Sequence, residues 1–184
     1  GLWQAHNGKL RCIDNGRSCN SNAATSEGEQ LRVISGDVVA GSARSFLTHI
    51  PPDLRQHFSL VGYSEDWARG YRQRAVDRPS LRFNVVAFWH HERKQVLFWI
   101  YFALLFGLLS SVLAFNRTPA LLTAVLRRCP LVPAFHYFDD LGAVDLGHLA
   151  ALGKSLIRLV HSSVGMLLDD GKGAEPSQEW IFLG

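Results

Sequence analysis

The sequence is poor in cysteine, and its three cysteines form no recognisable pattern. Cys12, Cys19 and Cys129 are odd in number and include no C-x-x-C pair, which argues against a disulfide framework. The eight histidines also lack the spacing of a zinc site. No secretory signal is visible. We therefore expect reduced thiols and an intracellular protein, nuclear or cytoplasmic, that is not secreted.

Charge of either sign is not in strong excess. Lys and Arg number 19 against 16 Asp and Glu, which leaves a net charge of +3 and a pI of about 8.9. This balance is compatible with a polyanionic partner without requiring one. With 47% hydrophobic and 19% charged residues, the chain is expected to fold. Its 184 residues allow one ordinary domain or two small lobes.

One long stretch contains no charge at all. The 20 residues from Val96 to Phe115 are long enough to span a bilayer, so a single-pass membrane protein spanning 96–115 is one hypothesis. Gly107 divides the stretch, and its first half is rich in β-branched and aromatic residues. We expect instead a buried strand over about 95–102, a turn at Gly107 and a helix after it, without stable membrane association.

Hydrophobic periodicity and turn residues predict a mixture of strands and helices. Leu31 to Phe46 is ambiguous, and Thr118 and Pro119 suit the start of a new helix. Strands are expected at 9–14, 58–63, 82–89, 95–102, 131–137, 164–168 and 180–183, and helices at 108–115, 118–128 and 146–161.

Two adjacent carboxylates, Asp139 and Asp140, stand between apolar runs. An unpaired buried carboxylate is costly. A tight hairpin would explain the pair, because Asp suits turns. A divalent metal would also explain it, because Mg²⁺ takes carboxylate oxygens as ligands. A second pair, Asp169 and Asp170, abuts glycine and lysine and is assigned to an ordinary turn.

A series of short motifs resembles the reverse transcriptases, and together they cover nearly the whole chain. The most specific is similar to the family's Y-x-D-D motif. In chain order the motifs are Lys9-Leu10-Arg11, Asp66 with Tyr71 five residues on, Leu104-Leu105-Phe106-Gly107 through Ser110, Tyr137-Phe138-Asp139-Asp140, Gly165 through Lys172, and Phe182-Leu183-Gly184. The sequence around these motifs is most similar to retroelement-type enzymes of eukaryotic genomes.

The resemblance implies an α+β fold. It predicts a right-hand polymerase palm sheet with packed helices and part of the fingers, without a thumb. Residues 1–58 would be partial fingers and 59–184 the palm, with some fingers elements within 74–103. The chain starts without a methionine and stops within an apolar pattern, which indicates a fragment of a longer protein.

The resemblance also implies RNA-directed DNA polymerisation. Two Mg²⁺ ions, or Mn²⁺, would serve the transfer of a nucleotide to a primer 3′-hydroxyl. The partners would be an RNA or DNA template with its primer and the deoxynucleoside triphosphates. The implied site residues are Asp66, Asp139 and Asp140 for catalysis and metal binding, Lys9, Arg11, Tyr71, Gly107 and Lys172 for the nucleotide, and Leu183 and Gly184 for the primer.

The sequence departs from the family pattern at three positions. Leu105 stands where proline is usual, Gly70 where alanine or another small residue is common, and Pro119 falls within the expected palm helix. A catalytically inactive relic that at most binds nucleic acid is therefore an alternative. One geometric requirement distinguishes the polymerase hypothesis from the membrane-protein hypothesis. The polymerase requires Asp66 close to Asp139, so the strands that carry them must pair.

Overall fold

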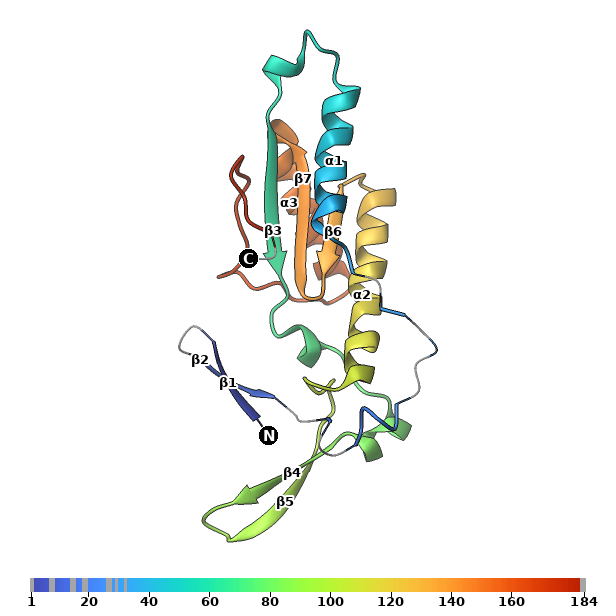
Figure 1. Cartoon of the computed structure of the whole chain (residues 1–184), viewed down its shortest axis with the longest axis vertical. Coiled ribbons are helices and arrows are strands. Elements are labelled where there is room, and N and C mark those ends of the chain that lie inside the picture. The colour runs from blue at the N-terminus through green and yellow to red at the C-terminus, as the bar shows by residue number, and fades with distance from the viewer. Residues whose placement is uncertain are drawn as a thin grey trace. The chain divides into compact units, whose positions relative to one another are not determined.

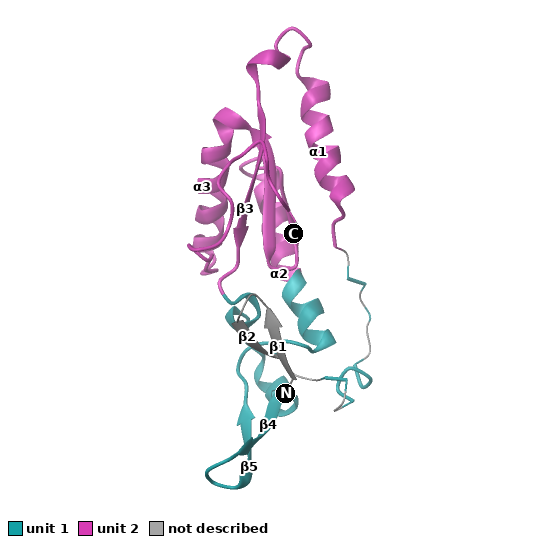
Figure 2. Cartoon of the chain, turned by 60° about the vertical axis from the view of Figure 1, so that its left-hand side comes forward, with its two compact units in different colours: residues 1–31, 69–116 teal, residues 32–68, 117–184 magenta. Residues whose placement is uncertain are grey.

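A computed structural model shows the arrangement of the chain (Figure 1). It describes residues 2–6, 9–13, 16–17, 20–25, 28, 30–31 and 33–182, with the backbone alone described over 2–13. The chain divides into two units, which are coloured separately in Figure 2. The first comprises 1–31 and 69–116, and the second comprises 32–68 and 117–184. The predicted assignment of 1–58 to fingers and 59–184 to palm stays a prediction.

The second unit is built on an antiparallel sheet of three strands in the order β3-β7-β6. Its strands are β3 (Leu60–Asp66), β6 (Ala134–Tyr137) and β7 (Asp140–Leu146). Its helices are α1 (Gly36–His49), α3 (Gly147–Ser163) and the second half of α2 (Leu109–Arg128), with the short η1 (Arg55–His57). The strands predicted at 58–63 and 131–137 and the helix at 146–161 are confirmed.

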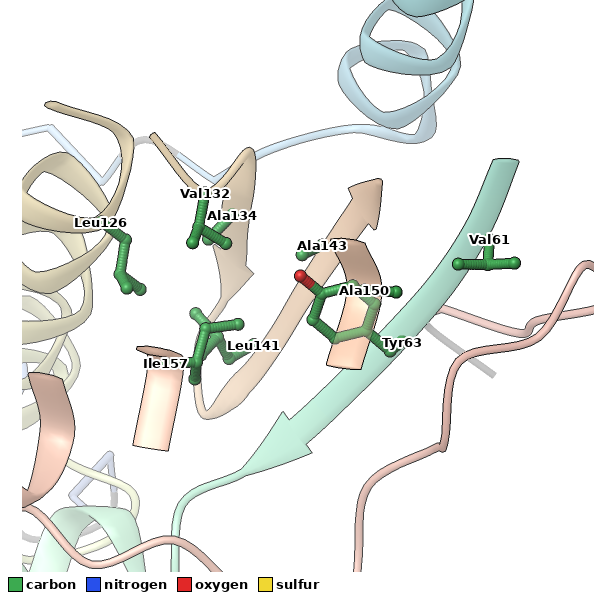
Figure 3. Packing of buried hydrophobic residues seen from close by; sticks show 9 residues of the cluster. All are labelled: Val61, Tyr63, Leu126, Val132, Ala134, Leu141, Ala143, Ala150 and Ile157. Atoms are coloured by element: carbon green, nitrogen blue, oxygen red, sulfur yellow. The ribbon is translucent and has the colours of Figure 1, made fainter. Parts of the chain in front are cut away.

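The core of this unit lies between one face of the sheet and the helices α2 and α3 (Figure 3). Alternate residues of a strand point to the same face, so Val61 and Tyr63 face the core together with Leu141 and Ala143. Ile157 of α3 packs on them. Burying one large apolar side chain stabilises a fold by about 1.5–3 kcal/mol, so this layer holds β3 and β7 in register.

The segment after α3 runs along the free edge of β3. Gly62 and Ser177 exchange two backbone hydrogen bonds of 2.8 and 3.0 Å, and Ser64 and Ala174 exchange two more. The strand predicted at 164–168 is wrong, because only an isolated bridge at Leu168 forms there. The strand predicted at 180–183 is wrong over its described residues 180–182, which are irregular. Positive φ angles at Gly165 and Gly173 interrupt regular pairing. The segment nevertheless covers an edge that would otherwise expose unpaired peptide groups.

The first unit contains two hairpins. One is formed by β1 (Leu2–His6) and β2 (Lys9–Ile13), and the other by β4 (Val85–His90) and β5 (Gln95–Ile100). Short 3-10 helices cover Gly70–Gln73 (η2) and Arg78–Phe83 (η3). The predicted strand at 82–89 therefore starts later, because Pro79 favours a helical first turn.

The prediction that the uncharged stretch from 96 to 115 is not one helix is confirmed. The stretch forms β5, a turn at Gly107 with φ +107°, and the start of α2, so a membrane span over 96–115 is wrong. The expectation that β5 is buried is also wrong. Phe98, Trp99 and Ile100 are 70%, 58% and 55% exposed, because the two-stranded sheet has no second layer of described residues over them.

Helix α2 continues through Pro119, and the predicted break before this residue is wrong. Proline removes one backbone hydrogen bond. Buried side chains lie on α2 both before and after the proline, at Phe115, Leu122 and Leu126, so packing of the whole helix outweighs that loss. By length and composition alone, α2 is the one helix among the described residues that could cross a membrane. A buried core helix passes the same test.

Candidate functional site

Asp139 and Asp140 lie where the β6–β7 hairpin turns. Tyr137 pairs with Asp140 in the register of the two strands, so Phe138 and Asp139 form the connection between them. Phe138 has φ +54°, a region that bulky side chains rarely adopt. Such strain is concentrated at functional sites in proteins. The hairpin explanation of the acid pair is therefore correct, and it leaves the metal explanation open.

The fold brings Asp66 to this turn. Asp66 ends β3 and is the cross-strand partner of Asp140. The backbone N–H of Trp67, the next residue, donates to the carbonyl of Asp139 at 3.4 Å. The expected pairing of the two strands is confirmed. Three carboxylates from distant parts of the sequence thus meet at one end of the sheet.

The carboxylates influence one another electrostatically. Burial, together with the neighbouring charges of Asp139 and Asp66, raises the pKa of Asp140 above its ordinary value, and Lys172 opposes this shift. Lys172 donates a hydrogen bond from Nζ to Oδ2 of Asp66, and this bond raises the pKa of the lysine. The other oxygen of Asp66, Oδ1, is buried and has no hydrogen-bond partner among the described residues.

The residues present suit a divalent cation in chemistry and charge. Carboxylate oxygens are the ligands that Mg²⁺ prefers. A cation would offset the burial and the carboxylate repulsion that raise the pKa of Asp140. The buried Oδ1 atom of Asp66 offers a ligand position. Among the described residues, however, no group of three His, Cys, Asp or Glu side chains is already arranged to hold a metal ion. Side chains at the turn would have to rotate to complete the ligand set.

The second acid pair forms a turn, as predicted. Oδ1 of Asp169 accepts from the backbone N–H of Gly171 at 3.0 Å, and the Asp170 side chain is 92% exposed. This turn also helps to build the site. The N–H of Asp169 donates to the carbonyl of Asp66 at 2.8 Å, and Oδ2 of Asp169 lies 4.0 Å from Nζ of Lys172.

A network of ion pairs surrounds a buried carboxylate next to the site, and the sequence analysis did not predict it. Glu65 precedes Asp66, and its fully buried carboxylate accepts from Nε and Nη2 of Arg158 at 2.7 and 3.2 Å. Nζ of Lys154 lies 3.8 Å from the same carboxylate. Two features of the sequence could have predicted this network. One is an acidic residue inside a buried strand, and the other is a pair of basic residues four positions apart on a predicted helix.

Tyr71 and Gly107 are the predicted nucleotide residues of the first unit whose surroundings are described. Tyr71 of η2 is half-buried and stacks on Phe115, with ring centroids 4.6 Å apart and planes at 13°. Gly107 lies in the turn that leads into α2, where Oδ1 of Asn22 accepts from the N–H of Leu109 at 3.0 Å. Tyr71 and Gly107 therefore both have structural roles within this unit, and their nucleotide roles stay predictions.

The remaining predicted residues are only partly described. Lys9 and Arg11 occupy alternate positions of β2, as predicted, so they share one face of that strand. Their side chains lie outside the described part of the structure. Leu183 and Gly184 also lie outside the described residues.

His136 of β6 predicts a pH dependence of stability. Burial, assisted by the charge of Arg127, lowers the pKa of His136 from 6.5 to about 4. Protonation therefore favours the unfolded chain, and the free energy of unfolding should fall as the pH decreases from about 6.5 to about 4. Burial also lowers the pKa of His161, which adds to this trend. His136→Gln should reduce the slope, by less than about 1.4 kcal/mol per pH unit because the ring is partly exposed.

Urea unfolding of the parent chain and His136→Gln at pH 4.5 and pH 7 measures this effect. Glutamine can still form a hydrogen bond in place of Nδ1, which lies 3.2 Å from Oγ1 of Thr123. Equal pH slopes for the two proteins would show that His136 titrates normally in the folded state.

Comparison with known proteins agrees with this geometry. No family model and no curated protein match the chain. A solved structure of a foamy viral protease–reverse transcriptase in complex with double-stranded DNA matches it with a TM-score of 0.63. The chain has an α+β fold similar to part of a reverse transcriptase. At 20% sequence identity, the match covers 98% of this chain and 27% of the solved chain. The reverse transcriptase-like fold thus corresponds to about a quarter of that longer protein.

Proposed function

We propose that the chain is the part of an RNA-directed DNA polymerase that carries its nucleotidyl-transfer carboxylates. The supporting observation is the pairing of β3 with β7, which sets Asp66 opposite Asp140 and beside the turn that contains Asp139. This placement, inside a reverse transcriptase-like fold, is what a carboxylate metal site for nucleotide transfer requires. A decayed retroelement or an active one could be the source of the chain.

The carboxylates would hold the metal in this proposal. Asp66 and Asp139 would bind two Mg²⁺ ions, or Mn²⁺, and Asp140 would support them. When bound, the ions would stabilise the attacking primer 3′-oxygen and the leaving pyrophosphate. The strained Phe138 turn would keep Asp139 at the tip of the hairpin, where a substrate phosphate can approach it.

Other residues would bind and orient the substrates. Lys9 and Arg11 would hold the triphosphate, with Arg suited to bidentate contacts. Tyr71 would lie under the incoming sugar, and Gly107 would allow close approach of backbone. The hydrogen bond to Asp66 raises the pKa of Lys172, and Lys172 would give its Nζ proton to the leaving pyrophosphate. Leu183 and Gly184 would contact the primer. The double-stranded DNA in the foamy viral structure supports a nucleic-acid partner.

A primer-extension assay tests the proposal. The chain, with an RNA template, a DNA primer and deoxynucleoside triphosphates, should extend the primer in Mg²⁺ or Mn²⁺ and stop when the metal is chelated. Mg²⁺ should also raise the melting temperature of the parent chain but not of Asp66→Asn, since a ligand that binds only the folded state stabilises it. The absence of both primer extension and a metal-dependent rise in melting temperature would contradict the proposal.

The second candidate is an inactive relic that binds nucleic acid without extending it. Leu105 favours this candidate, because it departs from the family pattern at a position where proline is usual. So does the lack of a ready-made group of three metal ligands among the described side chains. Retention of primer–template on a filter without extension would support the relic.

A further inference from the structure

The charged side chains on α3 contact both the site strand and the loop that carries Lys172. We infer that Lys154 and Arg158 are positioning residues that, anchored on the buried carboxylate of Glu65, clamp the 169–175 segment and thereby place Lys172 on Asp66. The consequence for the reaction rests on the proposed function, in which Lys172 is the proton donor. The contacts themselves all lie within the second unit.

Glu65 is the anchor of this arrangement. Its side chain is fully buried, and a buried charge is tolerated only when it is paired and hydrogen-bonded. Two N–H groups of Arg158 satisfy both carboxylate oxygens, and Lys154 adds a second positive charge at 3.8 Å. The two cations therefore cannot leave Glu65 without leaving its buried charge uncompensated, which is strongly destabilising.

The same two cations also bind the ends of the segment that carries Lys172. Nη1 of Arg158 donates to Oδ1 of Asp170 at 3.3 Å. Nζ of Lys154 donates to Oε1 of Glu175 at 2.7 Å and to the carbonyl of Ala174 at 3.2 Å. The Lys154 ammonium lowers the pKa of Glu175. Arg158 thus holds Asp170, two residues before Lys172. Lys154 holds Ala174 and Glu175, which follow Lys172.

Backbone contacts bring the same segment against β3. Ala174 and Ser64 exchange backbone hydrogen bonds of 3.2 and 3.1 Å, and the N–H of Asp169 reaches the carbonyl of Asp66. These bonds could hold the segment alone. The inference therefore predicts that the charged contacts, and not only the backbone, determine where Lys172 lies. Glu65 and Asp66 are adjacent residues whose side chains lie on opposite faces of β3, which links the anchor to the site.

The test removes the exposed ends of the clamp and leaves its buried anchor intact. In Asp170→Asn/Glu175→Gln, both substituted positions are exposed, so folding should persist. Hydrogen exchange of the Asp169, Lys172 and Ala174 amides should accelerate at least tenfold. A zero-length carbodiimide cross-link between Lys172 and Asp66, read by mass spectrometry, should fall at least threefold. In the parent chain, 0.5 M NaCl should act in the same direction, because salt screens partly exposed pairs.

Two further variants serve as controls. Asp53→Asn/Glu179→Gln removes the same charge at exposed positions outside the network and should change neither measurement. Asp170→Glu/Glu175→Asp keeps both charges and should restore exchange and cross-linking to within twofold of the parent. Unchanged exchange and cross-linking in Asp170→Asn/Glu175→Gln would overturn the inference and assign the placement of Lys172 to the backbone bonds. Neither measurement uses nucleotide or primer, so a failed extension assay would leave this result unaffected.

Discussion

Asp139→Asn is expected to abolish nucleotide addition while leaving the metal-free fold intact. The substitution keeps the size of the side chain and removes a proposed metal ligand. It also removes one of the charges that raise the pKa of Asp140, so the metal-free protein should be as stable as the parent or slightly more so. A loss of at least 100-fold in rate corresponds to about 2.7 kcal/mol of transition-state stabilisation.

Asp169→Asn is the matched control for this result. It alters the other acid pair, and the asparagine oxygen can still accept from the N–H of Gly171, as Oδ1 of Asp169 does. Primer extension on an RNA template, with urea unfolding of each variant without metal, measures both effects. If Asp139→Asn extends primers as well as the parent while Asp169→Asn does not, the wrong acid pair has been assigned to catalysis.

Gly173→Ala is expected to detach the loop that carries Lys172. Gly173 has φ +97°, and an added Cβ would lie 2.6 Å from the carbonyl oxygen of Ser64. The added Cβ would clash with the backbone of β3, and a positive φ angle disfavours any residue with a side chain. Such strain costs about 1–3 kcal/mol. The free energy of unfolding should fall by about this amount. Alternatively, the segment should separate from β3, with rapid hydrogen exchange at Asp169 and Ala174.

Gly171→Ala provides a control in the same loop. An added Cβ there would meet only Oδ1 of Asp169 at 3.5 Å, an ordinary contact. Its effect on the free energy of unfolding should stay within about 0.5 kcal/mol, as for most exposed substitutions. Equal effects of the two substitutions would show that the close approach of Gly173 to β3 does not hold the segment.

The sequence by itself determined the elements with strong local signals. Apolar spacing along 146–161 predicted α3, because helical periodicity records which face of an element is buried. The largely apolar run at 58–63 predicted β3. The division of the uncharged stretch at Gly107 was also predictable, since a positive φ angle there suits glycine. The juxtaposition of Asp66 with the Asp139–Asp140 turn was implied by the resemblance to reverse transcriptases, and the pairing of β3 with β7 confirms it.

Tertiary structure alone decided the rest. Proline predicts a helix break locally, but packing along α2 carried the helix through Pro119. Apolar residues predicted a buried β5, but burial depends on a second layer, and the described residues place none over it. The apolar run at 164–168 and the described residues 180–182 of the other run became irregular segments. Lys172 reaches Asp66, and Arg158 reaches Glu65, across more than 90 residues of sequence. Local patterns carry no information on such contacts, because they form only when the strands and α3 are packed together.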